Sequence, residues 1–174
     1  MTTLIETDRL LLRPFRQEDA ADCFAFLSHR ETCYLDGGYE PFSNMDEKYA
    51  LLMEKFATQE GQYMVELKGE GKVIGTLHLF PDQRRAVETT EIGYVISPGY
   101  RRQGYGREAV EAVIDHLFRE TDTRMITAGA AICNGPSIAM LEKLGFVREG
   151  IIRKGFFIPG QGPVDMVSFY REAQ

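Results

Sequence analysis

A basic, glycine-bearing turn lies at the centre of the chain, between a predicted strand and a predicted helix. Residues 91–96 have the pattern of a strand, and residues 104–119 carry apolar side chains at helical spacing. The turn between them, residues 101–107, reads RRQGYGR. The first turn of a helix has unpaired N–H groups and the positive end of the helix dipole, and glycine lets an anion reach them. This order of elements predicts a phosphate-binding turn that opens a helix.

The length and composition are typical of one globular domain that spans residues 1–174. With 44% hydrophobic and 26% charged residues, the chain is long enough to bury a substantial core. It has no apolar run of about 18 residues and no basic, then apolar, N-terminal segment, so we expect no membrane span and no signal peptide. The formal net charge of -6 argues against general nucleic-acid binding, which needs a basic surface.

The cysteines indicate the compartment. Cys23, Cys33 and Cys133 form no CxxC pair and leave an odd one out. This pattern favours reduced thiols in a cytoplasmic protein over a disulfide framework or a zinc site, and we expect no bound metal.

The N-terminal part of the chain predicts one strand followed by two helices. Residues 9–15 read as the strand, and a helix opens at residues 17–20. The spacing of apolar residues places Ala21, Phe24 and Leu27 on the buried face of that helix.

A loop over residues 33–41 and a second helix are predicted next. Ser43 is the expected N-cap of this helix, because a serine there precedes acidic residues and then an apolar stripe. The stripe consists of Tyr49, Leu52, Met53 and Phe56.

The rest of the chain predicts three strands joined by short connections, then a helix, a strand, a helix and two strands. The expected strands are 62–67, 73–80, 91–96, 125–131, 146–153 and 164–170, with helices over 104–119 and from Asn134 to Leu144. Short turns join antiparallel neighbours. We therefore expect an α/β (α+β) domain with a central mixed, mostly antiparallel sheet flanked by helices.

Two common nucleotide-binding motifs do not match the central turn. The chain has no GxxxxGK[ST] sequence, which excludes a Walker-type loop. It does not have GxGxxG either, because the third position of that pattern, after Gly104 and Gly106, is Ala109, and a dinucleotide-binding turn is expected early in a chain rather than at its centre. A nucleotide-binding protein such as an NAD enzyme thus rests on the glycine turn alone.

Several motifs in the same order resemble the GNAT superfamily of acyl-CoA-dependent N-acetyltransferases. These are RxxGxG at 101–106 after a strand, and KLGF at 143–146 at the end of the last helix. The opening TDRLLLRP at 7–14, NxxS at 134–137 and GFVxEG at 145–150 are similar to the RimJ/RimL-like branch, the ribosomal-protein N-terminal acetyltransferases and their relatives. The resemblance implies a GNAT-like acyl-CoA N-acyltransferase fold over nearly the whole chain.

The resemblance also implies acetyl-CoA as co-substrate. In the arrangement that the resemblance implies, backbone N–H groups of residues 101–106 face the pyrophosphate of coenzyme A. The pantetheine arm lies along strand 91–96 like an added strand. That arrangement requires strand 91–96 to diverge from the neighbouring strand that begins near Met125. The implied cofactor-binding residues are Tyr94, Val95, Ile96, Arg101, Arg102, Gln103, Gly104, Tyr105, Gly106, Asn134, Ser137 and Lys143.

Transfer of an acetyl group to an amine needs a base, because an alkyl ammonium must lose a proton before it attacks. We expect Glu91 to be this base. It belongs to strand 91–96, in which alternation places Glu91, Gly93 and Val95 on one face. A backbone N–H near Val95 or Ile96 is the expected donor to the thioester oxygen.

The acid that serves the leaving sulfur is less evident. Many GNAT members place a tyrosine seven residues after the asparagine of the last helix, and here that position is Leu141. In the branch that the chain resembles, the serine corresponding to Ser137 bonds or protonates the sulfur. Ser137 is therefore the second expected catalytic residue, with positioning of the sulfur as its alternative role.

The predicted activity is direct transfer of an acetyl group to a primary amine, either a protein N-terminus or a small molecule. Loops over residues 34–42, 78–85 and 156–163 are expected to shape the acceptor pocket. The alternative is a non-catalytic acyl-CoA-binding or regulatory module, because the tyrosine acid is missing. By analogy with this fold class, the closing strands predict a homodimer surface.

Overall fold

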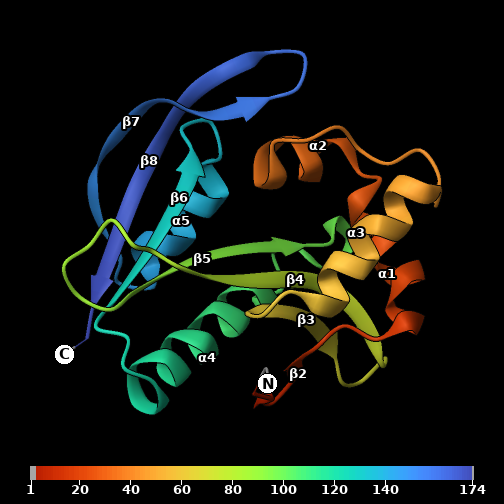
Figure 1. The fold of residues 1–174 in the computed structure, drawn as a ribbon, viewed down its shortest axis with the longest axis horizontal. Coiled ribbons are helices and arrows are strands. Elements are labelled where there is room, and N and C mark those ends of the chain that lie inside the picture. Colours follow the sequence, from red (N-terminus) through yellow and green to blue (C-terminus); the bar gives the residue numbers. More distant parts are fainter. Residues whose placement is uncertain (1–2, 174) are drawn as a thin grey trace.

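Eight strands form one sheet in the computed structural model, which describes residues 3–173 (Figure 1). Their order across the sheet is β1-β2-β3-β4-β5-β6-β8-β7. Every neighbouring pair is antiparallel except β5 and β6, which are parallel. The single parallel pair lies at the centre, so the sheet consists of two antiparallel halves that meet there.

The first half of the sheet holds β1 to β5. The bounds of its strands are β1 Ile5–Glu6, β2 Leu10–Arg13, β3 Gln62–Leu67, β4 Lys72–Pro81 and β5 Thr89–Ile96. The helical segments between β2 and β3 are η1 Gln17–Asp19, α1 Ala20–Leu27, α2 Arg30–Thr32, the π-helical turn η2 Cys33–Gly37, and α3 Glu47–Thr58. The chain then enters the second half through the turn after β5.

The second half begins with the short 3-10 turn η3 Pro98–Tyr100 and helix α4. Its remaining elements are α4 Tyr105–Glu120, β6 Met125–Ala131, α5 Gly135–Lys143, β7 Val147–Ile158 and β8 Gly162–Glu172. The long β7–β8 hairpin arches above the sheet toward α2 in Figure 1. Strand β7 is an edge strand, and most of its side chains are exposed.

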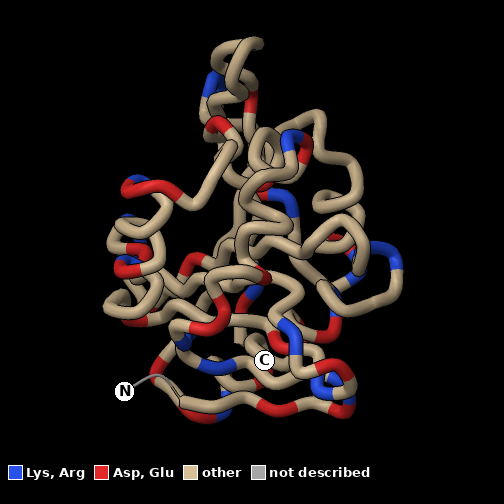
Figure 2. The backbone as a smooth tube through the Cα atoms, turned by 90° about the vertical axis from the view of Figure 1, so that its right-hand side faces the viewer, with Lys and Arg blue, Asp and Glu red and all other residues tan. Residues whose placement is uncertain are grey.

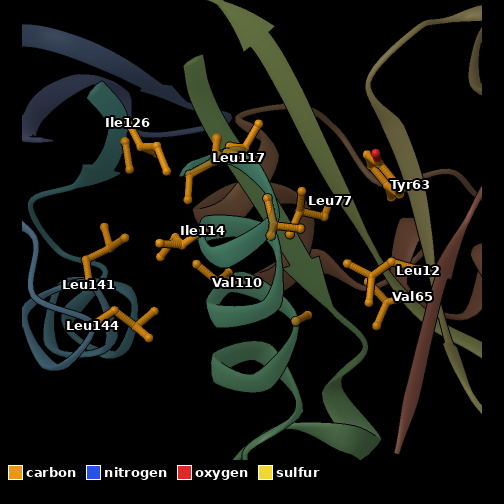
Figure 3. Packing of buried hydrophobic residues seen from close by; sticks show 14 of the residues in the cluster. Leu12, Tyr63, Val65, Leu77, Val110, Ile114, Leu117, Ile126, Leu141 and Leu144 are labelled. Atoms are coloured by element: carbon orange, nitrogen blue, oxygen red, sulfur yellow. The ribbon is translucent and has the colours of Figure 1, made fainter. Parts of the chain in front are cut away.

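Two hydrophobic clusters cover the two faces of the sheet. On one face α4 and α5 pack on the strands through Val110, Ile114, Leu117, Leu141 and Leu144, shown in Figure 3. On the other face α1 and α3 pack on β3, β4 and β5, and this cluster contains Phe26, Tyr49, Met53, Phe56, Met64, Val73 and Val95. Helices therefore flank a mixed, mostly antiparallel sheet, as the sequence predicts.

Three predictions for the N-terminal region were wrong in detail. Helix α1 buries Leu27 and packs Phe24 partly against the core as predicted, but Ala21 is exposed, and Cys23 and Phe26 are buried in addition. Residues 33–37 are not a loop but η2. Helix α3 is capped by Asp46, whose side chain accepts a hydrogen bond from the Tyr49 N–H, and not by Ser43. The short edge strand β1 was also missed.

Charged residues of both signs are distributed over the fold. In the view of Figure 2, basic and acidic stretches are interspersed along the backbone. No helix within residues 3–173 is long and apolar enough to cross a membrane.

A buried ion pair joins the end of β2 to the start of α1. The Arg13 guanidinium donates to both carboxylate oxygens of Asp19, at 2.7 and 2.8 Å, and donates to Glu66 at 2.5 Å. The side chains of Arg13 and Asp19 are each 3% exposed. A paired charge that is buried this deeply loses its compensation when one partner is removed.

We expect Asp19→Ala to lower the free energy of unfolding by about 3 kcal/mol, because the buried Arg13 charge then loses one of its two carboxylate partners and keeps Glu66. Urea denaturation measures this change. The control is Asp115→Ala, which removes an exposed partner of Arg119 and should cost less than about 1 kcal/mol. Equal losses in the two variants would contradict the prediction.

Candidate functional site

Strands β5 and β6 pair along the first half of β5 and then diverge. Their parallel pairing runs from Thr89↔Met125 to Ile92↔Ala128 and then stops. Beyond that point β5 continues to pair with β4 as far as Ile96, and β6 continues to pair with β8 as far as Ala131. The sequence prediction that strand 91–96 diverges from its neighbour is therefore confirmed.

A cavity of about 700 Å³ lies at this opening, between the starts of α4 and α5. Nine predicted cofactor-binding residues line it: Tyr94, Ile96, Arg101, Arg102, Gly104, Gly106, Asn134, Ser137 and Lys143. They come from β5, from the glycine turn and from α5, which are separated by up to about 50 residues in the chain but share this cavity.

The glycine turn exposes the first turn of α4 to the cavity. Gly104 is the N-cap of the helix and has a φ of 85°, a left-handed conformation that favours glycine. At Gly106 an added Cβ would lie 3.3 Å from Ile96 Cγ1 and 3.5 Å from Met140 Sδ, so a side chain would crowd the cavity here. Arg102 and Arg107 line the same end. Helix N–H groups, small residues and arginines together suit a phosphorylated ligand.

A half-buried carboxylate that the sequence analysis missed joins two of the predicted residues. Asp36 of η2 accepts from Arg101 Nη2 at 2.9 Å and from Asn134 Nδ2 at 3.1 Å. Arg101 also donates to the Ile96 carbonyl. Burial raises the pKa of Asp36, while Arg101 and Asn134 offset part of this effect. Asp36 therefore ties the segment before α3 to both walls of the cavity.

The first turn of α5 is fixed by its own cap. Asn134 Oδ1 accepts from the Ser137 N–H at 3.3 Å, which confirms the predicted helix start. The Ser137 hydroxyl lies 2.7 Å from the Tyr94 hydroxyl of β5. Leu141 is fully buried and packs in the core on the α4 and α5 face.

Three of the predicted cofactor-binding residues do not line this cavity. Val95 is buried against α1 and α3 on the other face of the sheet. Gln103 donates its side-chain amide to the Gly99 carbonyl, and the Tyr105 ring packs 4.4 Å from the Arg9 guanidinium. Only the backbone of these residues remains available to a ligand of the cavity.

Glu91 lies apart from Ser137. It is on the same face of β5 as Val95, and its side chain is 40% exposed. Its carboxylate accepts from Arg84 Nη2 at 2.9 Å, and Arg84 is itself held by the buried Asp82. The two predicted catalytic residues are thus on opposite faces of β5, one on each side of the opening between the strands.

A second, shallower hollow lies beside Glu91. It has a volume of about 370 Å³ and is lined by Arg84, Arg85, Glu149, Gly150, Ile151, Ile152 and Ser168. Arg85 donates to both oxygens of Glu149, and Ser168 donates to Glu149 as well. Since Arg84 both lines this hollow and contacts Glu91, the hollow and the base candidate share one surface.

The cavity thus brings together a parallel strand pair that diverges, a glycine turn at a helix N-terminus and a capped second helix. Comparison with known proteins identifies the family. The model of the acetyltransferase (GNAT) domain matches residues 9–147, and the chain belongs to this family. The protein is an N-acetyltransferase, since its curated relatives share that description.

One such relative is an uncharacterised N-acetyltransferase, YnaD of Bacillus subtilis, which is 31% identical over 86% of each chain. Among solved structures, a GNAT-family acetyltransferase from Bacillus anthracis superposes with a TM-score of 0.85 at 27% identity, over 98% of this chain and 99% of that one. A ribosomal L7/L12 acetyltransferase, RimL, in complex with coenzyme A has a TM-score of 0.80 over 98% of each chain. At 18% identity it shows the fold alone.

We expect Asp36→Asn to change stability in a pH-dependent way. Since the pKa of Asp36 is raised on folding, the unfolded chain ionises this group at lower pH than the folded chain does. The wild type therefore loses stability relative to the variant as the pH rises above the unfolded pKa. Urea denaturation of both proteins at about pH 3 and about pH 7 measures this difference. A relative loss by the variant on going to neutral pH would show that the Arg101 contact outweighs burial.

Proposed function

We propose that this enzyme transfers an acetyl group from acetyl-CoA to a primary amine by direct attack. The cavity between β5 and β6 fits the donor. The α4 N-terminus with Arg102 and Arg107 suits its phosphates, and the unpaired stretch of β5 beyond Ile92 suits the amide groups of its pantetheine arm. Coenzyme A supplies an activated thioester, and the chain supplies the site that orients it. The single observation that carries the proposal is this parting of the strands beside a glycine turn.

The acceptor amine belongs on the other face of β5. The hollow beside Glu91 has carboxylate, guanidinium and apolar groups within reach of one another, which suits a polar amine with an apolar body. Arg84 and Arg85 belong to the loop 78–85 that the sequence analysis assigned to the acceptor. In this proposal the amine nitrogen reaches the thioester through the opening between β5 and β6. Both a protein N-terminus and a small amine fit this description.

The chemical roles follow the two faces of β5. Glu91 takes the proton from the acceptor amine, directly or through a water. The backbone N–H of Val95 or Ile96 stabilises the charge that develops on the thioester oxygen. Ser137 contacts the departing sulfur from the α5 side, where its hydroxyl faces the cavity.

The proposal includes three further features. The RimJ/RimL-like motifs favour that branch, the three free cysteines suit the cytoplasm, and a homodimer would cover the edge strand β7. Its exposed apolar side chains are Val147, Ile151, Ile152 and Phe157. Sedimentation equilibrium of the wild type and of Ile151→Lys tests the dimer, since the charge would weaken an apolar interface.

We expect acetyl-CoA to protect Cys133 from alkylation. Cys133 lines the cavity and is exposed, whereas Cys23 and Cys33 are buried and burial raises the pKa of both thiols. Iodoacetamide should therefore label Cys133 first, and mass spectrometry with and without acetyl-CoA measures the protection. NAD and ATP are the matched control ligands. Equal labelling with and without acetyl-CoA, in a folded protein, would contradict the donor site.

We expect Glu91→Gln to lower kcat by about 100-fold or more with little change in acetyl-CoA affinity, because the amide cannot accept the proton. Thiol release in the presence of a panel of peptides and small amines, across pH, measures kcat. The control is Glu88→Gln, the same change at an exposed side chain one residue before β5. Unchanged turnover of the Glu91 variant at every pH would remove Glu91 from the mechanism.

A further inference from the structure

The hydroxyl of Tyr94, on strand β5, lies beside Ser137, whereas helix α5 itself contains no tyrosine. Leu141 stands at the position where many GNAT members carry a tyrosine. Its side chain is buried in the core and presents no polar group to the cavity. Tyr94 comes from β5, 43 residues before Ser137, and their hydroxyl oxygens are 2.7 Å apart. Both residues line the large cavity. The cavity therefore contains a tyrosine hydroxyl next to Ser137, but it comes from β5 and not from α5.

Two constraints hold this pair in place. Alternation along β5 points Tyr94 toward α4 and α5, and its ring packs against the core cluster on that face. Tyr94 also lies two residues beyond Ile92, the last residue of β5 that pairs with β6, so its side chain has room in the opening. Ser137 is held from the other side, because its N–H bonds to the Asn134 cap. Neither hydroxyl depends on a flexible loop.

We propose that Tyr94 is a positioning residue for Ser137 that orients its hydroxyl toward the departing sulfur and resupplies its proton. The inference rests on the proposed function of the cavity. As the carbon–sulfur bond breaks, its electron pair stays on sulfur and Ser137 gives its proton to that sulfur. Tyr94 gives its own proton to the Ser137 oxygen. Water in the open cavity returns a proton to Tyr94, which balances the proton that the acceptor nitrogen releases to Glu91.

The surroundings suit a phenol that stays protonated until it is needed. Burial raises the pKa of Tyr94 to about 12, and the Asp36 carboxylate acts in the same direction, while the hydrogen bond with Ser137 opposes them. The charged and titratable groups that line the cavity with Tyr94 come from three segments. They are Glu31 and Asp36 from α2 and η2, Tyr100, Arg101, Arg102 and Arg107 from η3 and the glycine turn, and Cys133 and Lys143 from before and at the end of α5. Asp36 is paired with Arg101, which compensates its negative charge.

The first test is Tyr94→Phe, which removes one oxygen and keeps the ring in the core. We expect kcat for thiol release to fall by about 100-fold, with the calorimetric affinity for coenzyme A nearly unchanged. The control is Tyr49→Phe, which removes a hydroxyl that donates to the Ala20 carbonyl on the opposite face of the sheet. That variant should lose stability and keep its kcat.

The pair is tested by a double variant. If Tyr94 acts through Ser137, Tyr94→Phe combined with Ser137→Ala should be no slower than Ser137→Ala alone. Losses that multiply, or a Tyr94→Phe enzyme with wild-type kcat, would overturn the inference. Failure of the wild type to bind coenzyme A would overturn the proposed function and this inference with it, whereas wild-type turnover with an unaffected Tyr94 variant would overturn this inference alone.

A second measurement separates proton supply from shape. Fluorinated tyrosine placed at position 94 keeps the ring and the hydroxyl but lowers the pKa of the phenol. The ultraviolet absorbance of the phenolate, taken against Tyr94→Phe across pH, reports that pKa directly and does not depend on activity. We expect the alkaline limb of the kcat–pH profile to shift to lower pH by the same amount. An unmoved limb would show that Tyr94 supports Ser137 only through packing.

Discussion

The structure depends on one backbone constraint, the end of the β5–β6 pairing at Ile92↔Ala128. Each strand is still held on its outer side, β5 by β4 and β6 by β8, so neither can drift to close the gap. Backbone N–H and C=O groups left unpaired in a sheet need other partners. A ligand with amide groups can supply them. In the proposed mechanism, this gap is where a donor on the α4 and α5 face meets an acceptor on the other face.

Polar contacts hold the elements around the gap in place relative to one another. Asp36 joins Arg101 to Asn134, and through them joins the end of β5 to the start of α5. On the other face Asp82 holds Arg84, whose guanidinium contacts Glu91 and whose hydrogen bonds hold the pKa of Asp82 at about 2. Arg84 can serve a base candidate in two ways, by holding the Glu91 carboxylate in place or by releasing it when an acceptor enters. Charge pairs therefore lie on both faces of β5.

Much of this fold could be predicted from the sequence because its signals are local. The alternation of strand 91–96, the glycine turn and the Asn134 cap each depend on a few neighbouring residues, and the structure has them as expected. The errors concern contacts that are distant in the chain. Residues 33–37 look like a loop since they lack a periodic apolar pattern, yet the contact of Asp36 with Arg101, 65 residues later, accompanies a helical turn. Ser43 was predicted as the cap with the acidic residues after it in the first turn, whereas the helix begins later, at Glu47, and Asp46 is its cap.

The difference between local signals and contacts that are distant in the chain also applies to the proposed acid of the site. The family motif assigns the acid to a tyrosine at one position of the last helix. Leu141 stands at that position here, so the motif identifies no acid. The chemistry requires only a hydroxyl near the sulfur and a second group that can exchange a proton with it, and it is indifferent to which element carries them. Strand β5 and helix α5 come from different parts of the chain and both line the cavity, where the hydroxyl oxygens of Tyr94 and Ser137 are 2.7 Å apart. An aligned motif cannot reveal that distance, because it arises only when the two elements have packed on the same core.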